Sequence, residues 1–413
     1  MSRFRSFVLR PSIALPVDQV IFALTNFLPL FVLSRHVGPD EFGELALVFS
    51  IVAGITLLLR SWTGIPSLLG HAESTDAAAR AAIRVGLVVS LLGASLLFVV
   101  LDDQPLMLAV VIVVGAPAAF GADAMRHAYM ARANTKALLR LEAVWLVAEL
   151  VLLALSFVSS ESSAFLAAGS WTVGALAALA LSRPTTGGKD VLDWYDRVKY
   201  EARSLAVDAL ANFVRNQGFL LAVAAIGGAA LAGSYRLGIG ILAPATMLIV
   251  GWRSHSVVRL RGEDSLSTRL TLITPPLLVG CIGLLAVAVT PSSLKAELAG
   301  NTDADALLTA LAVVTLLASV DSFFQALLIS QRRASVVART RIVTAAIWIV
   351  GVWLVEPFDV GGVRTLVVSV AILSTVCWIL AGTFTRADSS LAAAGEPMAI
   401  PNFSENPRVS HGR

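Results

Sequence analysis

Apolar segments of about 20 residues recur along the whole chain, and short polar connections separate them. A segment of this length crosses the roughly 30 Å hydrocarbon core of a bilayer as an α-helix. The expected fold class is therefore an all-α polytopic membrane protein. The pattern predicts twelve transmembrane helices, near residues 13–33, 44–69, 81–101, 106–125, 141–160, 162–182, 203–226, 234–257, 271–291, 304–330, 342–357 and 361–384.

The first two predicted helices repeat in the second half of the chain at an offset of 190 residues. The repeat includes polar positions, since Asp18 aligns with Asp208 and Asn26 with Asn216. Repeated halves of a membrane protein typically place a solute site at their interface. We expect two pseudo-symmetric six-helix lobes, residues 1–182 and 203–384.

The remaining segments read as connections. Residues 183–202 contain Thr185-Thr186-Gly187-Gly188 and then a charged, aromatic stretch, which predicts a cytoplasmic linker with an amphipathic surface helix. Residues 385–413 turn polar and contain several prolines, so we expect a disordered cytoplasmic tail.

Basic residues gather on one side of the predicted bundle when the connections are assigned alternately. The opposite side carries only Arg35, Lys295 and Arg364. The positive-inside rule then places both termini in the cytoplasm. Arginine exceeds lysine, and alanine, leucine and valine dominate, as in proteins from GC-rich bacterial genomes. The predicted location is the bacterial inner membrane.

Composition narrows the function. Hydrophobic residues make up 57% of the chain and charged residues 14%, so the lipid bilayer is an expected partner. The net charge of +3 reflects topology, and we expect no nucleic-acid partner. Cys281 and Cys377 fall inside predicted helices and fit no disulfide or metal spacing. We also find no nucleotide-binding glycine loop and no nucleophile motif, so we expect neither a cofactor nor enzymatic activity.

Polar stripes occur on the first and seventh predicted helices. Asp18 and Asn26 share a face of the first, and Asp208, Asn212, Arg215 and Asn216 share one on the seventh. Arg215 follows the cytoplasmic end of its helix by about 18 Å, near mid-membrane, where an arginine costs several kcal/mol unless it meets water or an anion. We therefore predict a polar cavity between these helices.

Each candidate has an alternative. Arg215 can form an internal ion pair, and the three asparagines can serve as interhelical hydrogen-bonding groups. Two further arginines, Arg60 and Arg253, lie toward the cytoplasmic ends of the second and eighth helices. With Arg215 they can form a ladder for a phosphate-bearing headgroup, or they can snorkel to the interface.

Acidic residues inside spans allow further roles. Asp18 and Asp208 are candidates for ion coupling or for contacts that hold a lobe together. Glu149, in the middle of the fifth span, can carry a coupling proton or pair with a buried arginine. Asp123 and Asp321 are expected to pair with the basic connections that follow them, Arg126 to Arg140 and Arg332 to Arg341.

At this point the residues resemble a family. Asp18-Gln19 through Asn26-Phe27-Leu28, followed by a glycine-containing turn, is similar to the first hairpin of bacterial polysaccharide-biosynthesis flippases. These belong to the multidrug/oligosaccharidyl-lipid/polysaccharide (MOP) superfamily. The clearest segment is Ser34-Arg35-His36-Val37-Gly38-Pro39-Asp40-Glu41-Phe42-Gly43.

The resemblance implies two six-helix lobes around a V-shaped cavity and export of a polyprenyl-diphosphate-linked oligosaccharide to the outer leaflet. It also implies that cavity arginines engage the diphosphate, a role matched by Arg215, with Arg60 and Arg253 below it. The expected partners are the lipid-linked oligosaccharide and the glycosyltransferases and polymerase of its pathway. The alternatives are an ion-coupled drug or cation antiporter of the same superfamily and a membrane-embedded glycosyltransferase or polymerase.

Overall fold

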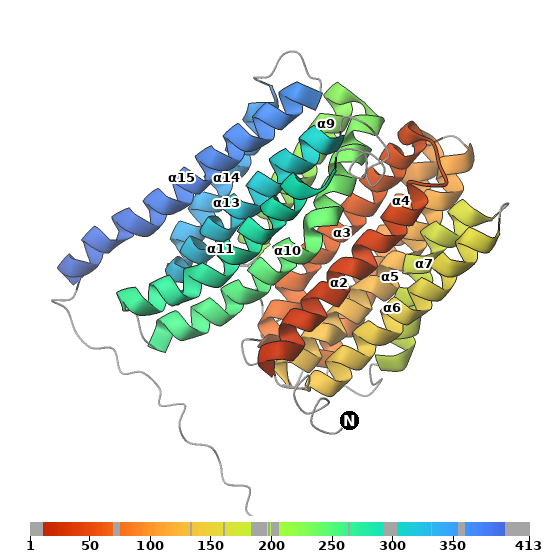
Figure 1. Cartoon of the computed structure of the whole chain (residues 1–413). Coiled ribbons are helices and arrows are strands. Elements are labelled where there is room, and N and C mark those ends of the chain that lie inside the picture. The colour runs from red at the N-terminus through yellow and green to blue at the C-terminus, as the bar shows by residue number, and fades with distance from the viewer. Residues whose placement is uncertain are drawn as a thin grey trace, which may run out of the picture.

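Every described element of the computed structural model is a helix (Figure 1). The structure describes residues 11–68, 75–101, 103–132, 134–159, 162–182, 196, 199, 206–262, 265–291, 304–331, 333–353 and 360–392. The N-terminal half contains α2 (Pro11–Leu33), α3 (Pro39–Leu68), α4 (Thr75–Val100), α5 (Asp103–Ala131), α6 (Thr135–Val158) and α7 (Ser163–Ser182).

The C-terminal half begins with a helix that changes its winding. Residues 206–213 are helical and continue into the π-helical turn η2 (Val214–Gly218) and then α9 (Phe219–Gly227). The later helices are α10 (Ala229–Gly262), α11 (Leu266–Val289), α13 (Ala304–Ser330), α14 (Ala334–Val352) and α15 (Val360–Ala392).

Eleven helices of the described chain are long and apolar enough to cross a membrane, and Val17–Leu33 of α2 is a shorter apolar helix. The expected all-α multi-pass fold is confirmed. Several helices extend beyond the predicted spans: α14 begins at Ala334 rather than near 342, and α15 ends at Ala392 rather than near 384. Apolarity marks where a helix crosses hydrocarbon, whereas the backbone stays helical into the polar region beyond.

The predicted linker and tail fall largely outside the described residues. Within the linker, Lys199 Nζ lies 3.0 Å from Asp196 Oδ1, and the two residues are three positions apart in the sequence, about one helical turn. The predicted tail from 385 onward overlaps the end of α15, and its residues 393–413 lie outside the described chain.

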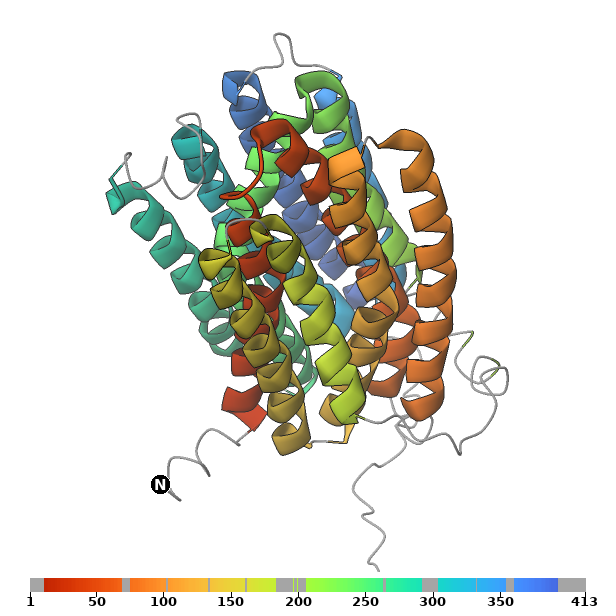
Figure 2. The same ribbon diagram turned by 90° about the vertical axis from the view of Figure 1, so that its right-hand side faces the viewer.

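The helices form two bundles that meet along α10 (Figures 1 and 2). Helices α2 to α7 pack with one another, and α10 to α15 do the same. Across the boundary, α10 packs against both α2 and α3.

Glycines from the sequence repeat hold the bundles close near the 34–38 turn. Gly43 and Gly233, equivalent at the 190-residue offset, contact each other: a Cβ on Gly233 would lie 2.9 Å from Gly43 Cα. A Cβ on Gly43 would overlap the Ala229 carbonyl group. Small residues let backbones approach this closely in membranes. On the predicted topology, this contact closes the extracellular end of the interface.

Candidate functional site

A cavity of about 350 Å³ lies between the two bundles. Helices α2 and α3 form one wall, with Trp145 and Trp171 behind them, and η2, α9, α10 and α13 form much of the other. The lining is largely apolar and aromatic with a few charged groups, as in many small-molecule sites. A cavity is therefore present where it was predicted, between the first and seventh helices, but its lining is more apolar than the polar stripes indicated.

Arg215 lines this cavity from the π-helical turn η2. Its Nε donates to Asn216 Oδ1 at 3.1 Å, and no carboxylate contacts its guanidinium in the described chain. Single π-helical turns are rare and often occur at functional sites because they redirect side chains. The alternative for Arg215, an internal ion pair, is thus not found among the described residues.

Arg236 lines the same cavity from α10, and its Nε is buried. The described chain offers this guanidinium neither a hydrogen bond nor an ion pair. From its position near the outer end of the eighth predicted span, Arg236 would be expected to snorkel to the interface. The structure instead places Arg236 in the lining of the central cavity.

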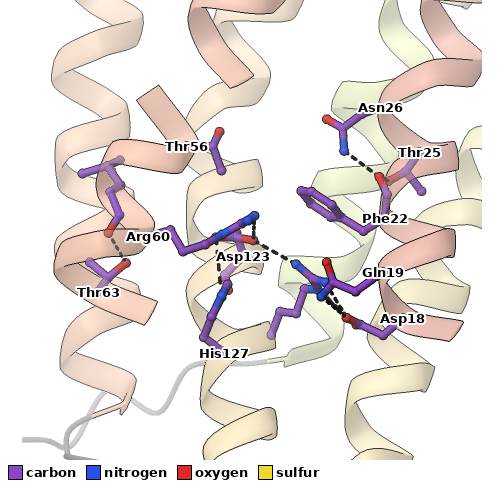
Figure 3. Close-up of polar contacts among 12 residues, drawn as sticks. Asp18, Gln19, Phe22, Thr25, Asn26, Thr56, Arg60, Thr63, Asp123 and His127 are labelled. Atoms are coloured by element: carbon purple, nitrogen blue, oxygen red, sulfur yellow. Dashed lines mark hydrogen bonds and ion pairs between the residues drawn. The ribbon is translucent and has the colours of Figure 1, made fainter. Parts of the chain in front are cut away.

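Arg60 also lines the cavity, but a carboxylate neutralises it. Its Nε and Nη2 donate to the two Asp123 carboxylate oxygens at 3.1 and 2.7 Å, as Figure 3 shows. Its guanidinium carbon also lies 5.2 Å from the centre of the Phe22 ring. The bidentate geometry holds Arg60 firmly and leaves little of its charge for a ligand.

Asp18 and Asp123 belong to a buried ionic network in the N-terminal lobe (Figure 3). Arg126 Nε donates to both Asp18 carboxylate oxygens, at 3.0 and 3.1 Å. Arg126 Nη2 makes a further, shorter contact with Asp18 Oδ2. Arg126 also lies 3.2 Å from Glu142 Oε1 and 3.5 Å from Asp123 Oδ1. The expected pairing of Asp123 with the basic residues after it is confirmed in Arg126. For Asp18, the structure favours the alternative of a contact within its lobe.

Asp208 and Arg253 belong to the equivalent network of the C-terminal lobe. Arg341 donates to Asp208 Oδ1 at 3.1 Å and to Gln325 Oε1 at 2.8 Å. Arg253 donates to the same Gln325 oxygen at 2.7 Å. Arg253 is not among the residues that line the central cavity. Of the three arginines in the predicted ladder, only Arg60 and Arg215 face the cavity, and Arg236 joins them.

The two networks occupy matching positions but exchange their charges. Helices α6 and α14 begin after Asn134 and Arg333, an offset of 199 residues. At that offset Glu142 matches Arg341, and Arg126 matches Gln325. Arg341 escaped sequence analysis because it was assigned to a connection between spans. The sequence did contain one signal for Arg341: at the 199-residue offset it aligns with Glu142, so a basic residue replaces an acidic one at the same helical position.

The amides differ in position. Asn26 lines the cavity, and its Nδ2 donates to the Phe22 carbonyl oxygen at 2.7 Å on the same helix. Asn216 also lines the cavity, next to Arg215, whereas Asn212 does not. The sequence stripe therefore brings two of the three asparagines to the cavity.

Glu149 is fully buried within α6 and does not line the cavity. Neither of its carboxylate oxygens has a hydrogen-bond partner in the described chain. The expected pairing with a buried arginine is therefore not found there. A coupling role for Glu149 stays a prediction.

Asp321 is the acidic group of the cavity lining. It accepts a hydrogen bond from Thr375 Oγ1 at 2.7 Å. It has no ion pair with the described residues of the basic connection that follows, contrary to expectation. The described residues also contain no group of three or more histidine, cysteine or acidic side chains able to hold a metal ion.

Neither a protein-family model nor a curated protein sequence matches this chain. Solved structures do. An inward-facing multidrug-resistance MATE transporter of the MOP superfamily aligns over 93% of this chain and 99% of its own, with 13% identity and a TM-score of 0.63. An outward-facing MATE transporter of that superfamily aligns over 94% and 96%, with 12% identity and a TM-score of 0.62.

The chain has the MATE transporter fold. A third similar structure is a MOP superfamily transporter from Pyrococcus furiosus, with 12% identity, a TM-score of 0.59 and coverage of 94% of this chain and 96% of that one. The reverse polarity of that transporter's binding pocket suggests a different function for it. The likeness to the MOP superfamily, inferred from a short hairpin segment, thus extends at the level of fold to nearly the whole chain.

Proposed function

We propose that this protein is a flippase that moves a polyprenyl-diphosphate-linked oligosaccharide from the cytoplasmic to the outer leaflet of a bacterial plasma membrane. The carrying observation is a cavity between two lobes that holds two guanidinium groups, Arg215 and Arg236, neither in contact with a carboxylate in the described chain, with Asp321 of the same lining near Arg215. The cavity supplies a solute site, and the arginines set its preference for an anion.

Transport by alternating access is supported by the architecture. The same fold occurs in transporters solved in inward-facing and outward-facing forms, and this chain resembles both about equally. A site between two pseudo-symmetric bundles can be exposed to either side by rocking one bundle against the other. The glycine contact between Gly43 and Gly233 would open in the outward-facing state.

A diphosphate suits the charge of the site. Guanidinium groups bind phosphate oxygens in bidentate fashion and stay charged when partly dehydrated. A charge in a largely apolar cavity is costly unless water or a counter-charge meets it, so a diphosphate would stabilise the loaded cavity. Arg60, already neutralised by Asp123, would add a hydrogen-bonding group rather than a free charge. The proposed role of Arg253 is indirect, because Gln325 holds it away from the cavity lining.

The main alternative, a drug or cation antiporter, fits the charges less well. A cationic substrate needs acidic contacts, and Asp321 is the cavity's acidic lining residue among those described, against Arg215 and Arg236, since Asp123 already neutralises Arg60. The other alternative, a membrane glycosyltransferase or polymerase, lacks support from sequence motifs, and the similar structures are transporters.

The remaining roles follow from the flippase proposal. Both termini would lie in the cytoplasm, and no cofactor would be needed. Glycosyltransferases would supply the lipid-linked substrate on the cytoplasmic face, and a polymerase or ligase would consume it outside. Glu149, whose buried carboxylate has no hydrogen-bond partner in the described chain, is the proposed coupling group, while Asp18 and Asp208 hold their lobes together.

The test is the leaflet distribution of polyprenyl-linked oligosaccharide in cells depleted of the protein, read with a membrane-impermeant glycan label on sealed membranes of each orientation. Depletion should trap the glycolipid on the cytoplasmic face, and wild-type protein should restore its export. The doubly substituted Arg215→Gln/Arg236→Gln protein should fail at equal abundance. Arg364→Gln, which removes an exposed arginine of α15, is the matched control and should restore export. An unchanged distribution after depletion would overturn the flippase proposal.

A further inference from the structure

The two walls of the cavity differ in charge. Arg215 and Arg236, which contact no carboxylate in the part of the chain that the structure describes, come from the C-terminal lobe, while the arginine of the N-terminal wall, Arg60, is held by Asp123. An anionic group entering the cavity is therefore drawn toward the C-terminal wall. Whatever else the ligand carries must face the N-terminal wall.

Neutral donors without a hydrogen-bond partner in the described chain line both walls: Trp348 Nε1 and Ser374 Oγ on the C-terminal side, and Ser50 Oγ, Trp145 Nε1 and Trp171 Nε1 on the N-terminal side. Because Arg215 and Arg236 draw the anion to the C-terminal wall, the N-terminal donors are left for the rest of the ligand. Ser50 Oγ and Trp171 Nε1 are buried, line the cavity and lack a hydrogen-bond partner in the described chain. Each of these two residues is 2% exposed, so bulk water does not readily satisfy it. A buried polar group left without a partner costs about 1–3 kcal/mol, which favours a ligand or water molecule that supplies one.

Aromatic rings frame these donors. Trp145 and Trp171 both line the cavity, with ring centres 6.1 Å apart and planes inclined at 59°. The Phe49 ring meets Trp171 edge-on at 5.2 Å and fixes its orientation. Gly174 leaves room for Trp145, since a Cβ there would lie 2.5 Å from the Trp145 ring. A rigid indole with a free N–H presents an apolar face and a polar edge, which suits a sugar ring with its C–H faces and hydroxyl edge.

Resting on the proposed function, we propose that the N-terminal wall is a glycan subsite. The first sugar of the substrate packs beside Trp145 and Trp171 and bonds to Trp171 Nε1 and Ser50 Oγ, while the diphosphate faces Arg215 and Arg236. This arrangement fixes the orientation of the substrate across the two lobes. It also assigns recognition of the sugar to one lobe and recognition of the anion to the other.

The test compares two ligands on purified full-length protein in detergent. The first is farnesyl diphosphate. The second is farnesyl diphosphate carrying one hexose, with glucose, galactose and N-acetylglucosamine versions measured separately. Wild-type protein should bind at least one glycosylated probe more tightly than farnesyl diphosphate.

Substitutions then separate the subsites. Trp171→Phe, which keeps a ring but removes the N–H, and Ser50→Ala should each weaken the preferred glycosylated probe by about 3- to 10-fold, the effect of one hydrogen bond. Neither should change the affinity for farnesyl diphosphate. Arg215→Gln should weaken both probes. Trp378→Phe is the matched control, because Trp378 Nε1 is also buried and unpartnered but lies outside the cavity lining, and it should change neither affinity.

The outcomes distinguish the two proposals. If farnesyl diphosphate binds and depends on Arg215, but Trp171→Phe and Ser50→Ala leave the preference for sugar unchanged, these groups bind only water and the glycan subsite is wrong. Equal binding of bare and glycosylated probes by the wild type would overturn it as well. If no diphosphate probe binds, or binding is indifferent to Arg215, the proposed function itself fails.

Discussion

The two lobes repeat one helical plan but treat their arginines differently. In the N-terminal lobe, Arg60 and Arg126 each contact a carboxylate. In the C-terminal lobe Arg341 contacts Asp208, whereas Arg253 meets the neutral Gln325. The cavity arginines of that lobe, Arg215 and Arg236, have no carboxylate contact in the described chain and are available to a ligand. The N-terminal lobe neutralises its buried arginines with its own carboxylates, whereas the C-terminal lobe exposes Arg215 and Arg236 to the cavity.

The two lobes share one helical plan but place the arginine that binds the repeated aspartate on different helices. The arginine that binds the aspartate of the repeat comes from α5 in the N-terminal lobe and from α14 in the C-terminal lobe. In the first lobe Glu142 fills the matching position on α6, and in the second Gln325 fills the matching position on α13. Replacing a carboxylate with an amide leaves the second network with fewer negative charges.

The largest expected effect follows from breaking the N-terminal network. Arg126→Leu leaves Asp18 and Glu142 buried without their cation, and we expect the free energy of unfolding to fall by about 3–5 kcal/mol. Denaturant titration of the purified protein in detergent measures this loss. The double substitution Arg126→Gln/Glu142→Arg copies the C-terminal arrangement and should recover at least half of it. Equal losses in the single and double variants would show that the lobes are not interchangeable at these positions.

A smaller effect is expected in the C-terminal network. Arg341→Gln removes contacts to Asp208, whose side chain is 36% exposed and can be hydrated, and to Gln325. We expect a loss of about 1.5–3 kcal/mol, in the range of hydrogen bonds to charged groups. The same titration applies. A larger loss than that of Arg126→Leu would contradict the expectation that the N-terminal network contributes more to stability than the C-terminal one.

The contact between the lobes should respond to a single methyl group. Gly43→Ala places a Cβ against the Ala229 backbone, and overpacking of this kind costs about 1–3 kcal/mol. Because the strain exists only when the lobes touch there, we expect a shift toward the outward-open form. Labelling of a cysteine placed at Ser50 by an impermeant external thiol reagent, in a protein lacking Cys281 and Cys377, should become faster. Gly38→Ala, with no atom within 4 Å of the added Cβ, is the control.

The smallest effect on stability is expected at Glu149. Glu149→Gln keeps the shape of a carboxyl group that has no hydrogen-bond partner in the described chain, so unfolding should change by less than about 1 kcal/mol. If the carboxylate couples transport to protons, the dependence of flipping on an imposed pH gradient should disappear. Retention of that dependence in the substituted protein would remove the proposed coupling role.

Hydropathy and the internal repeat predicted most of the fold, because twelve apolar segments and two repeated helices constrain a membrane bundle strongly. Arg215 and Asn216 were found from helical spacing alone. Arg236 lines the cavity, although its position near the end of a predicted span suggested snorkelling, because hydropathy does not show which face of α10 meets the other lobe. Arg126 and Arg341 contact Asp18 and Asp208 on helices distant in sequence, and a single sequence gives only an indirect signal for such pairing, here the match of Arg341 with Glu142. The match between Glu142 and Arg341 depends on where α6 and α14 begin, and the structure supplies those starts.

The most direct test of the account reconstitutes the purified protein in liposomes and follows two fluorescent cargoes in parallel. One is a short-chain prenyl diphosphate carrying a labelled saccharide, and the other is a lipophilic cationic dye. The account predicts movement of the diphosphate-linked cargo, loss of that movement in Arg215→Gln/Arg236→Gln, and no protein-dependent movement of the dye. Movement of the dye with none of the diphosphate cargo would contradict it.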